Sequence, residues 1–171
     1  MRYGTITEKS GFTLIELIVV MALIGIVMFA ALPRFQRVIT DPARIVSQWI
    51  IWKIPELKQR AVSENRRYAL QIDLSENKLW TTHEAMSEAE KVQAAESGYV
   101  LPHSISVSNI EFPDDRVIST GVAQILFYSK GYSDRAIIHL SSGDDRTFSY
   151  VIEPFLNKIG FFDTHVGFTE P

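Results

Sequence analysis

One carboxylate stands inside a long apolar segment near the N-terminus. Residues 12–32 read FTLIELIVVMALIGIVMFAAL, and Glu16 is the one charged residue among them. A charged side chain in a membrane helix costs roughly 2.5–3.5 kcal/mol on insertion scales, and a position near the helix end lowers that cost. Glu16 is therefore a candidate functional group, and its chemistry would be ion pairing with a cation in the same apolar surroundings.

The histidines and aspartates elsewhere show no pattern typical of an active site. The four histidines, at positions 83, 103, 139 and 165, lie far apart and none belongs to a metal-binding spacing such as H-E-x-x-H. His139 lies between two apolar residues of a strand-like segment, where we expect it to face solvent or to form a hydrogen bond. The Asp114-Asp115 and Asp144-Asp145 pairs are interpreted as turn residues.

Recognised catalytic motifs are missing as well. The sequence contains no G-x-S-x-G, no phosphate-binding loop and no dinucleotide fingerprint. We therefore predict no catalytic residues, no metal and no cofactor, and we predict that the protein is not an enzyme.

Composition excludes several further classes of protein. The chain has 171 residues, a net charge of −3 and no cysteine, which excludes a disulfide scaffold, a thiolate zinc site and a cysteine nucleophile. The net charge offers nucleic acid no broad attraction. Arg66-Arg67 is the one adjacent basic pair, and residues 161–171 contain neither Lys nor Arg. No nucleic-acid partner is expected.

The apolar segment has the length of a membrane span. As an α-helix, residues 12–32 would be about 31 Å long, close to the thickness of the bilayer hydrocarbon. Residues 1–11 are polar with a small positive excess, which places them in the cytoplasm by the positive-inside rule. A cleaved secretory signal has a shorter apolar run followed by a small-residue cleavage site. A plain signal anchor is the alternative that hydropathy alone would favour.

The segment around Glu16 resembles a known processing signal. Gly11-Phe12-Thr13-Leu14-Ile15-Glu16, followed by the apolar run and Pro33, is similar to the class III signal of type IV pilins and type II secretion pseudopilins. The resemblance implies that a prepilin peptidase cleaves between Gly11 and Phe12 and methylates the new amino terminus of Phe12. The apolar segment would then remain on the mature protein.

Such cleavage would place an ammonium group at Phe12, one helical turn before Glu16. The two charges could pair within one chain, where the helix dipole also favours a carboxylate at this position. The resemblance favours the other arrangement, in which Glu16 of one subunit meets Phe12 of its neighbour during filament assembly. Pro33 is expected to bend the helix further along.

A second helix is expected beyond the membrane segment. Thr40-Asp41-Pro42 has the composition of a helix start, and the helix should end near residues 65–67. Its expected apolar face comprises Ile45, Trp49, Trp52 and Leu57, and its expected polar side comprises Gln48, Lys53, Lys58 and Arg60. The two tryptophans are expected to pack under a sheet or to lie near the membrane edge, and a ligand-stacking platform is the alternative.

The remainder of the chain has the pattern of an antiparallel sheet. Alternation at residues 68–74 predicts a strand, and a return strand follows a turn. Residues 83–98 are expected to form a short helix or a loop. Further strands are expected at residues 105–112, 122–129, 135–141, 147–153 and 158–162. The predicted fold class is α+β and pilin-like, with a long N-terminal helix packed on an antiparallel sheet.

Fragments of this second half are similar to the H-type minor pseudopilins and their FimT-like relatives. These fragments are Arg60-Ala61-Val62, Leu101-Pro102, residues 125–131, Ser133-Asp134 and residues 136–140. The chain lacks the C-terminal cysteine pair of many type IV pilins and the acidic calcium loop of the major pseudopilin. Both differences favour a minor component.

Taken together, the resemblance implies a type II secretion minor pseudopilin. Residues 1–11 would be a removed leader, residues 12–32 a single inner-membrane span, residues 33–67 a periplasmic helix and residues 68–171 a periplasmic head. The implied partners are prepilin peptidase, the major and other minor pseudopilins, the inner-membrane assembly platform and membrane lipid. Two alternatives stay open: a type IV minor pilin for pilus assembly or DNA uptake, and a membrane-anchored periplasmic binding domain.

Overall fold

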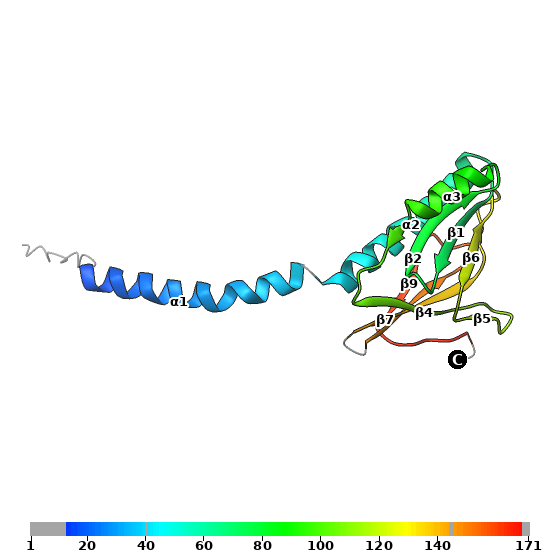
Figure 1. Ribbon diagram of the computed structural model, residues 1–171. Coiled ribbons are helices and arrows are strands. Elements are labelled where there is room, and N and C mark those ends of the chain that lie inside the picture. The colour runs from blue at the N-terminus through cyan, green and yellow to red at the C-terminus, as the bar shows by residue number, and fades with distance from the viewer. Residues whose placement is uncertain (1–12, 40, 144–145, 169–171) are drawn as a thin grey trace, which may run out of the picture. The chain divides into compact units, whose positions relative to one another are not determined.

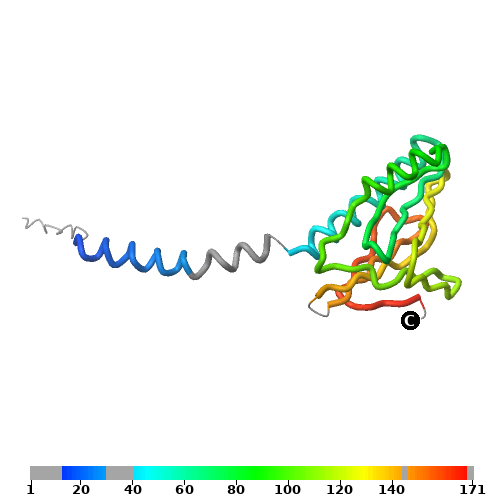
Figure 2. The backbone as a smooth tube through the Cα atoms, in the orientation of Figure 1, coloured from blue at the N-terminus to red at the C-terminus, as the bar shows by residue number. Residues whose placement is uncertain are grey.

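The chain consists of two units that divide between Asp41 and Pro42, and each is described by itself (Figures 1 and 2). The computed structural model describes residues 13–39, 41–143 and 146–168, with side chains for all of these except residues 30–39. The predicted leader at residues 1–11 therefore lies outside the described residues. The second unit begins at Pro42, and the division into leader, membrane span, periplasmic helix and head stays a prediction.

The first unit contains one helix, α1 (Leu14–Ile39), which continues through Pro33. Among the described residues, no helix combines the length and the apolar character needed to cross a membrane. The predicted span at 12–32 extends past these residues, because Phe12 and the side chains of residues 30–32 are not described. The span and the bend at Pro33 both stay predictions.

The second unit begins with helix α2 (Pro42–Ser63). Its first residue is a proline, as the sequence indicated, because the fixed φ of proline suits the first helical position and its missing N–H loses no bond there. The helix ends in a left-handed turn at Asn65, whose φ is 49°. The N–H of Arg66 reaches back to the carbonyl of Ala61 at 3.1 Å, which closes the last turn.

Two antiparallel sheets follow. The first has strand order β3-β2-β1-β6 and the second has strand order β5-β4-β7-β8-β9. The strands are β1 (Tyr68–Asp73), β2 (Lys78–His83), β3 (Tyr99–Val100), β4 (Ile105–Glu111), β5 (Val117–Ile118), β6 (Val122–Phe127), β7 (Ala136–Ser142), β8 (Thr147–Ile152) and β9 (Gly160–Phe162). The α+β fold class is confirmed, and the short edge strands β3 and β5 are the elements that the sequence did not predict.

Residues 83–98 were expected to form a short helix or a loop. They contain a short helix, α3 (Glu88–Glu96), so the first of these two expectations is confirmed. Ser87 caps it: the Ser87 hydroxyl accepts the Glu90 N–H at 3.3 Å, and the Glu90 carboxylate accepts the Ser87 N–H at 2.7 Å. This reciprocal capping satisfies two backbone donors that a helix start otherwise leaves open.

Helix α2 and both sheets share one hydrophobic core (Figure 1). Buried apolar residues recur on α2 at every third or fourth position: Ala43, Val46, Ile50, Ile54, Leu57 and Ala61. They belong to the same buried cluster as Leu70 of β1, Ile125 of β6 and Tyr150 of β8. Each large side chain buried in this way contributes about 1.5–3 kcal/mol, so the core depends on the face that α2 presents.

That face differs from the one expected. Ile45 is 48% exposed and Trp52 is 79% exposed, so neither packs in the core, although their spacing placed both on the apolar face. Trp49 is half-buried and stacks on Tyr99 with ring centroids 4.7 Å apart. Apolar residues occupy more than one side of this helix, so the apolar pattern by itself does not identify the side that packs against the sheets.

Lys58, which was expected on the polar side, is buried with 4% of its surface exposed. Its ammonium donates hydrogen bonds to the carbonyl oxygens of Glu153 at 2.6 Å, Pro154 at 3.2 Å and Leu156 at 2.6 Å. Burial lowers the pKa of Lys58, and the nearby Glu153 carboxylate opposes that shift. Lys58 thereby ties α2 to the segment that follows β8.

Replacing Lys58 with methionine tests this tie. We expect Lys58→Met to lower the free energy of unfolding by about 1–3 kcal/mol, because three carbonyl groups lose their donor while the aliphatic stem is kept. Urea denaturation of the purified chain would measure the change.

Lys53→Met is the matched control on the same helix. Lys53 pairs with Glu56 at the surface at 3.1 Å, and such a pair contributes at most about 1 kcal/mol. Equal stabilities for the Lys58 variant and the unchanged chain would contradict a structural role for the buried ammonium.

Candidate functional site

The first turn of α1 holds the carboxylate that the sequence singled out. Thr13 precedes the helix, and its hydroxyl accepts the backbone N–H of Glu16 at 3.3 Å. Its carbonyl accepts the N–H of Leu17 at 3.2 Å. Thr13 is therefore an N-cap and Glu16 the third helical residue, a position where a carboxylate interacts favourably with the helix dipole.

The described surface of α1 is apolar on every side. All side chains from Thr13 to Phe29 are exposed, and the large apolar ones range from 41% exposed at Val20 to 84% at Phe29. A helix that is apolar all round is normally buried within a protein assembly or in a membrane. Glu16 is the one carboxylate on this described surface.

The other predicted site residues are only partly accessible to the structure. Gly11 and Phe12 lie outside the described residues, and for Pro33 only the helical backbone is described. The structure therefore places Glu16 and its cap, while the cleavage site, the methylated residue and the charge pair stay predictions.

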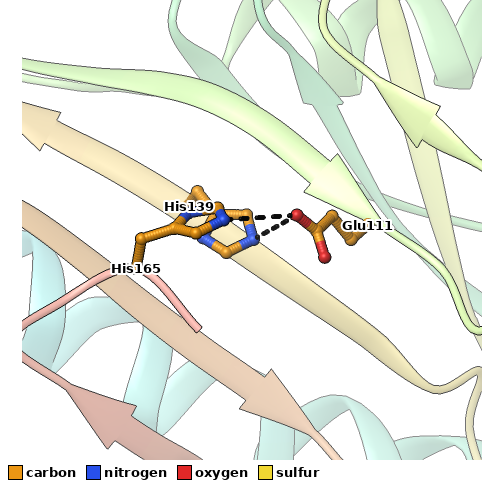
Figure 3. Close-up of side chains that lie close together, drawn as sticks. All are labelled: Glu111, His139 and His165. Atoms are coloured by element: carbon orange, nitrogen blue, oxygen red, sulfur yellow. Dashed lines mark ion pairs between the residues drawn. The ribbon is translucent and has the colours of Figure 1, made fainter. Parts of the chain in front are cut away.

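A polar cluster that the sequence did not predict lies in the second unit. Glu111 ends β4, His139 lies in β7, and His165 follows β9 in the C-terminal segment; Figure 3 shows the three side chains converging. The Glu111 Oε1 atom lies 3.3 Å from Nε2 of His139 and 3.6 Å from Nε2 of His165. The two imidazole rings stack with centroids 4.3 Å apart.

His139 is held rigidly within this cluster. It faces away from the core side of β7, yet only 1% of it is exposed, so of the two environments expected for it the hydrogen-bonded one is found. Its Nδ1 atom lies 3.0 Å from the Ser149 hydroxyl on the neighbouring strand β8. That hydroxyl donates to the Thr164 carbonyl at 2.7 Å and accepts the Val166 N–H at 3.2 Å.

These bonds determine the protonation of the imidazole. The single hydroxyl proton of Ser149 is used on Thr164, so His139 must donate its own proton from Nδ1. Burial, with a smaller contribution from His165, lowers the pKa of His139 to about 4. At neutral pH the ring is therefore uncharged, and its Nε2 presents a lone pair towards the Glu111 carboxylate.

That lone pair has no hydrogen-bond partner in the described structure. The approach of 3.3 Å to Glu111 is not a hydrogen bond in this tautomer, because neither atom carries a proton. Asn109 lies directly opposite His139 across the two strands, and its side-chain oxygen is also buried without a partner. Two buried acceptor atoms on these neighbouring strands therefore lack a hydrogen-bond donor, which costs free energy.

Sequence reasoning missed this cluster because its members are 28 and 26 residues apart, at positions 111, 139 and 165. One signal was available. His139 occupies a strand position opposite to the core-facing Ile138 and Leu140, and the aromatic C-terminal segment had to pack somewhere. The pairing of that segment with the outer face of β7 and β8 is a tertiary contact that no local pattern encodes.

Comparison with known proteins supports the interpretation of the N-terminal segment and the predicted fold. Residues 7–32 match the family described as the prokaryotic N-terminal methylation motif. No curated protein sequence matches the chain significantly.

Two solved structures share the fold. Both are of the minor pseudopilin EpsH from the type 2 secretion system of Vibrio cholerae. One aligns with a TM-score of 0.51 at 12% identity over 72% of this chain and 98% of that one. The other aligns with a TM-score of 0.54 at 10% identity over 74% and 99% of the respective chains. The predicted pilin-like fold is thereby confirmed.

The neutral state of His139 predicts a pH dependence of stability. Its pKa is about 4 in the folded chain and about 6.5 in an unfolded one. Between pH 6.5 and pH 4, His139 is protonated in the unfolded chain but not in the folded chain. Protonation therefore favours the unfolded chain, and the free energy of unfolding falls as the pH is lowered from 6.5 towards 4. The loss attributable to His139 should reach about 3 kcal/mol.

Urea denaturation between pH 7.5 and 4, with EDTA present, would measure this loss. His139→Asn is the control, since the amide retains a donor towards Ser149 and does not titrate. An identical pH dependence in the variant would contradict the assignment to His139.

Proposed function

We propose that this chain is a minor pseudopilin of a type II secretion system, most similar to the H type, and that it helps a periplasmic filament export folded proteins across the outer membrane. The observation that carries the proposal is the methylation motif at residues 7–32 joined to a head with the fold of EpsH. The motif covers residues 7–32, and the fold similarity covers 72–74% of the chain.

The proposal also explains why α1 is apolar all round between Leu14 and Phe29, the part whose side chains are described. In the precursor, residues 12–32 would lie in the inner membrane with the head in the periplasm, and lipid would cover the apolar surface. In the filament, the same surface would be covered by helices of neighbouring subunits. Both environments would remove from water the apolar side chains between Leu14 and Phe29, which are exposed in the single chain.

The position of Glu16 suits a role in assembly. Removal of the leader after Gly11 would leave a methylated ammonium at Phe12, next to Thr13 and the helix start. Inside a helical bundle, an ammonium and a carboxylate each lose their hydration, and pairing them relieves both costs together. Such a pair would form between neighbouring subunits at one axial offset and would thereby select the register of the filament.

In this role the chain is a substrate and a structural subunit. Prepilin peptidase would process it, the major and other minor pseudopilins would pack against it, and the inner-membrane platform would assemble the filament.

Mass spectrometry of the N-terminus tests the processing step. The native mature polypeptide should begin with N-methyl-Phe12, and Gly11→Val should leave uncut precursor in the membrane because the resemblance implies a peptidase that requires glycine there. Gly4→Val, the same change within the leader, is the control and should be processed normally. A native chain beginning at Met1, or past Leu32, would contradict the proposal.

Glu16→Gln tests the charge pair separately from helix capping. Glutamine at the third helical position still serves a threonine cap, so helix formation should be retained while the negative charge is lost. We expect normal processing and membrane insertion but at least about tenfold less chain in purified filaments, because the neighbour's ammonium is left buried and unpaired.

Thr13→Ala is the complementary variant, since it removes the cap and retains the charge. Quantitative immunoblotting of filament fractions would compare both variants with the unchanged chain. Normal incorporation of Glu16→Gln would show that the charge is dispensable, and an equal defect in Thr13→Ala would assign the effect to helix capping.

A further inference from the structure

The cluster of Glu111, His139 and His165 has the composition of a metal site. Two imidazoles and one carboxylate each offer one ligand atom, and these atoms all lie within 4.8 Å of one another. Imidazole nitrogen together with carboxylate oxygen is a donor set that suits Zn²⁺ and related first-row ions. We propose that these three residues bind a divalent transition-metal ion such as Zn²⁺, which fastens the C-terminal segment to the outer face of the second sheet.

The separations of the ligand atoms match the proposed ion. Zinc lies about 2.0–2.2 Å from nitrogen and oxygen ligands in a tetrahedral site, which places neighbouring ligand atoms about 3.3 Å apart. The Glu111 oxygen lies 3.3 Å from Nε2 of His139 and 3.6 Å from Nε2 of His165 (Figure 3). All three ligand atoms lie within 4.8 Å of one another, and a rotation of the His165 ring would bring them to bonding distance of one ion.

His139 is prepared for this role by its hydrogen bonds. Donation from Nδ1 to Ser149 at 3.0 Å fixes the tautomer that leaves the Nε2 lone pair free. Metal-bound histidines characteristically donate their other N–H to a neighbouring acceptor, which orients the ring. The Nε2 atom is buried and has no hydrogen-bond partner in the described structure. Burying an acceptor without a partner costs free energy, and a bond from Nε2 to a metal ion would remove that cost.

The two remaining ligands differ in mobility. The Glu111 side chain is 17% exposed, whereas the His165 side chain is 54% exposed and can turn. The rings of His139 and His165 now stack with an interplanar angle of 28°. Coordination of one ion by both nitrogens requires the His165 ring to tilt out of this stack. Water would take the remaining tetrahedral position on the exposed side.

Metal binding would attach the C-terminal segment more firmly to the second sheet. Two hydrogen bonds hold the C-terminal segment to the sheet at Ser149, whose hydroxyl donates to the carbonyl of Thr164 and accepts the N–H of Val166. A metal bond to His165, between these two residues, would link the segment to both β4 and β7. The bound ion would thereby stabilise the last described residues of the head, and the inference does not rest on the proposed function.

Calorimetric titration of the full chain in detergent with Zn²⁺ alone tests the inference. We expect one ion per chain and a higher midpoint of thermal unfolding with Zn²⁺ than with EDTA. His165→Ala and Glu111→Gln should each weaken binding by at least about 100-fold, since loss of even an outer-shell partner costs about 10–100-fold. Both variants should keep the circular dichroism of the unchanged chain.

His103→Ala is the matched control, because His103 is an exposed histidine of the same head outside the cluster. It should bind Zn²⁺ with unchanged affinity and stoichiometry. Absence of binding to the unchanged chain would overturn the inference. Binding that persists in His165→Ala, or that is lost equally in His103→Ala, would also overturn it, since zinc would then be held by other surface groups.

Discussion

The structure depends on a single constraint: a continuous apolar helix face must be removed from water. Helix α2 has a buried apolar stripe, and the two sheets of its own chain cover that stripe from Ala43 to Ala61. The described surface of α1 is apolar on all sides and is exposed throughout. The proposed membrane and filament environments would both cover the apolar surface of the first helix.

The head is organised around α2 rather than around either sheet alone. Strands of both sheets contribute to one buried cluster with α2, so the helix joins two sheets that share no strand. Polar contacts reinforce this arrangement at its edges. Lys58 bonds to three backbone carbonyls beyond β8, and Arg60 donates to the Tyr68 hydroxyl at the start of β1 at 3.0 Å.

The outer face of the second sheet is closed by the C-terminal segment, and this closure creates the buried polar cluster. Ser149 is fully buried because Thr164 and Val166 lie over it, and the same segment brings His165 onto His139. A histidine on the outer face of a sheet would otherwise be hydrated and able to titrate freely. Covered in this way, it is neutral, fixed in one tautomer and directed at a carboxylate.

The amino-acid sequence by itself determined the N-terminal methylation motif, the apolar first helix, the start of the second helix at Pro42 and the main strands. The motif follows from a family resemblance, and the helices and strands follow from local patterns of composition, period and turn residues. Tertiary structure alone decided which side of α2 is buried, since Ile45 and Trp52 also fit an apolar pattern yet are exposed. It also decided the cluster of Glu111, His139 and His165. Those residues are distant in sequence, and only strand pairing and the folding back of the C-terminal segment bring their ligand atoms together.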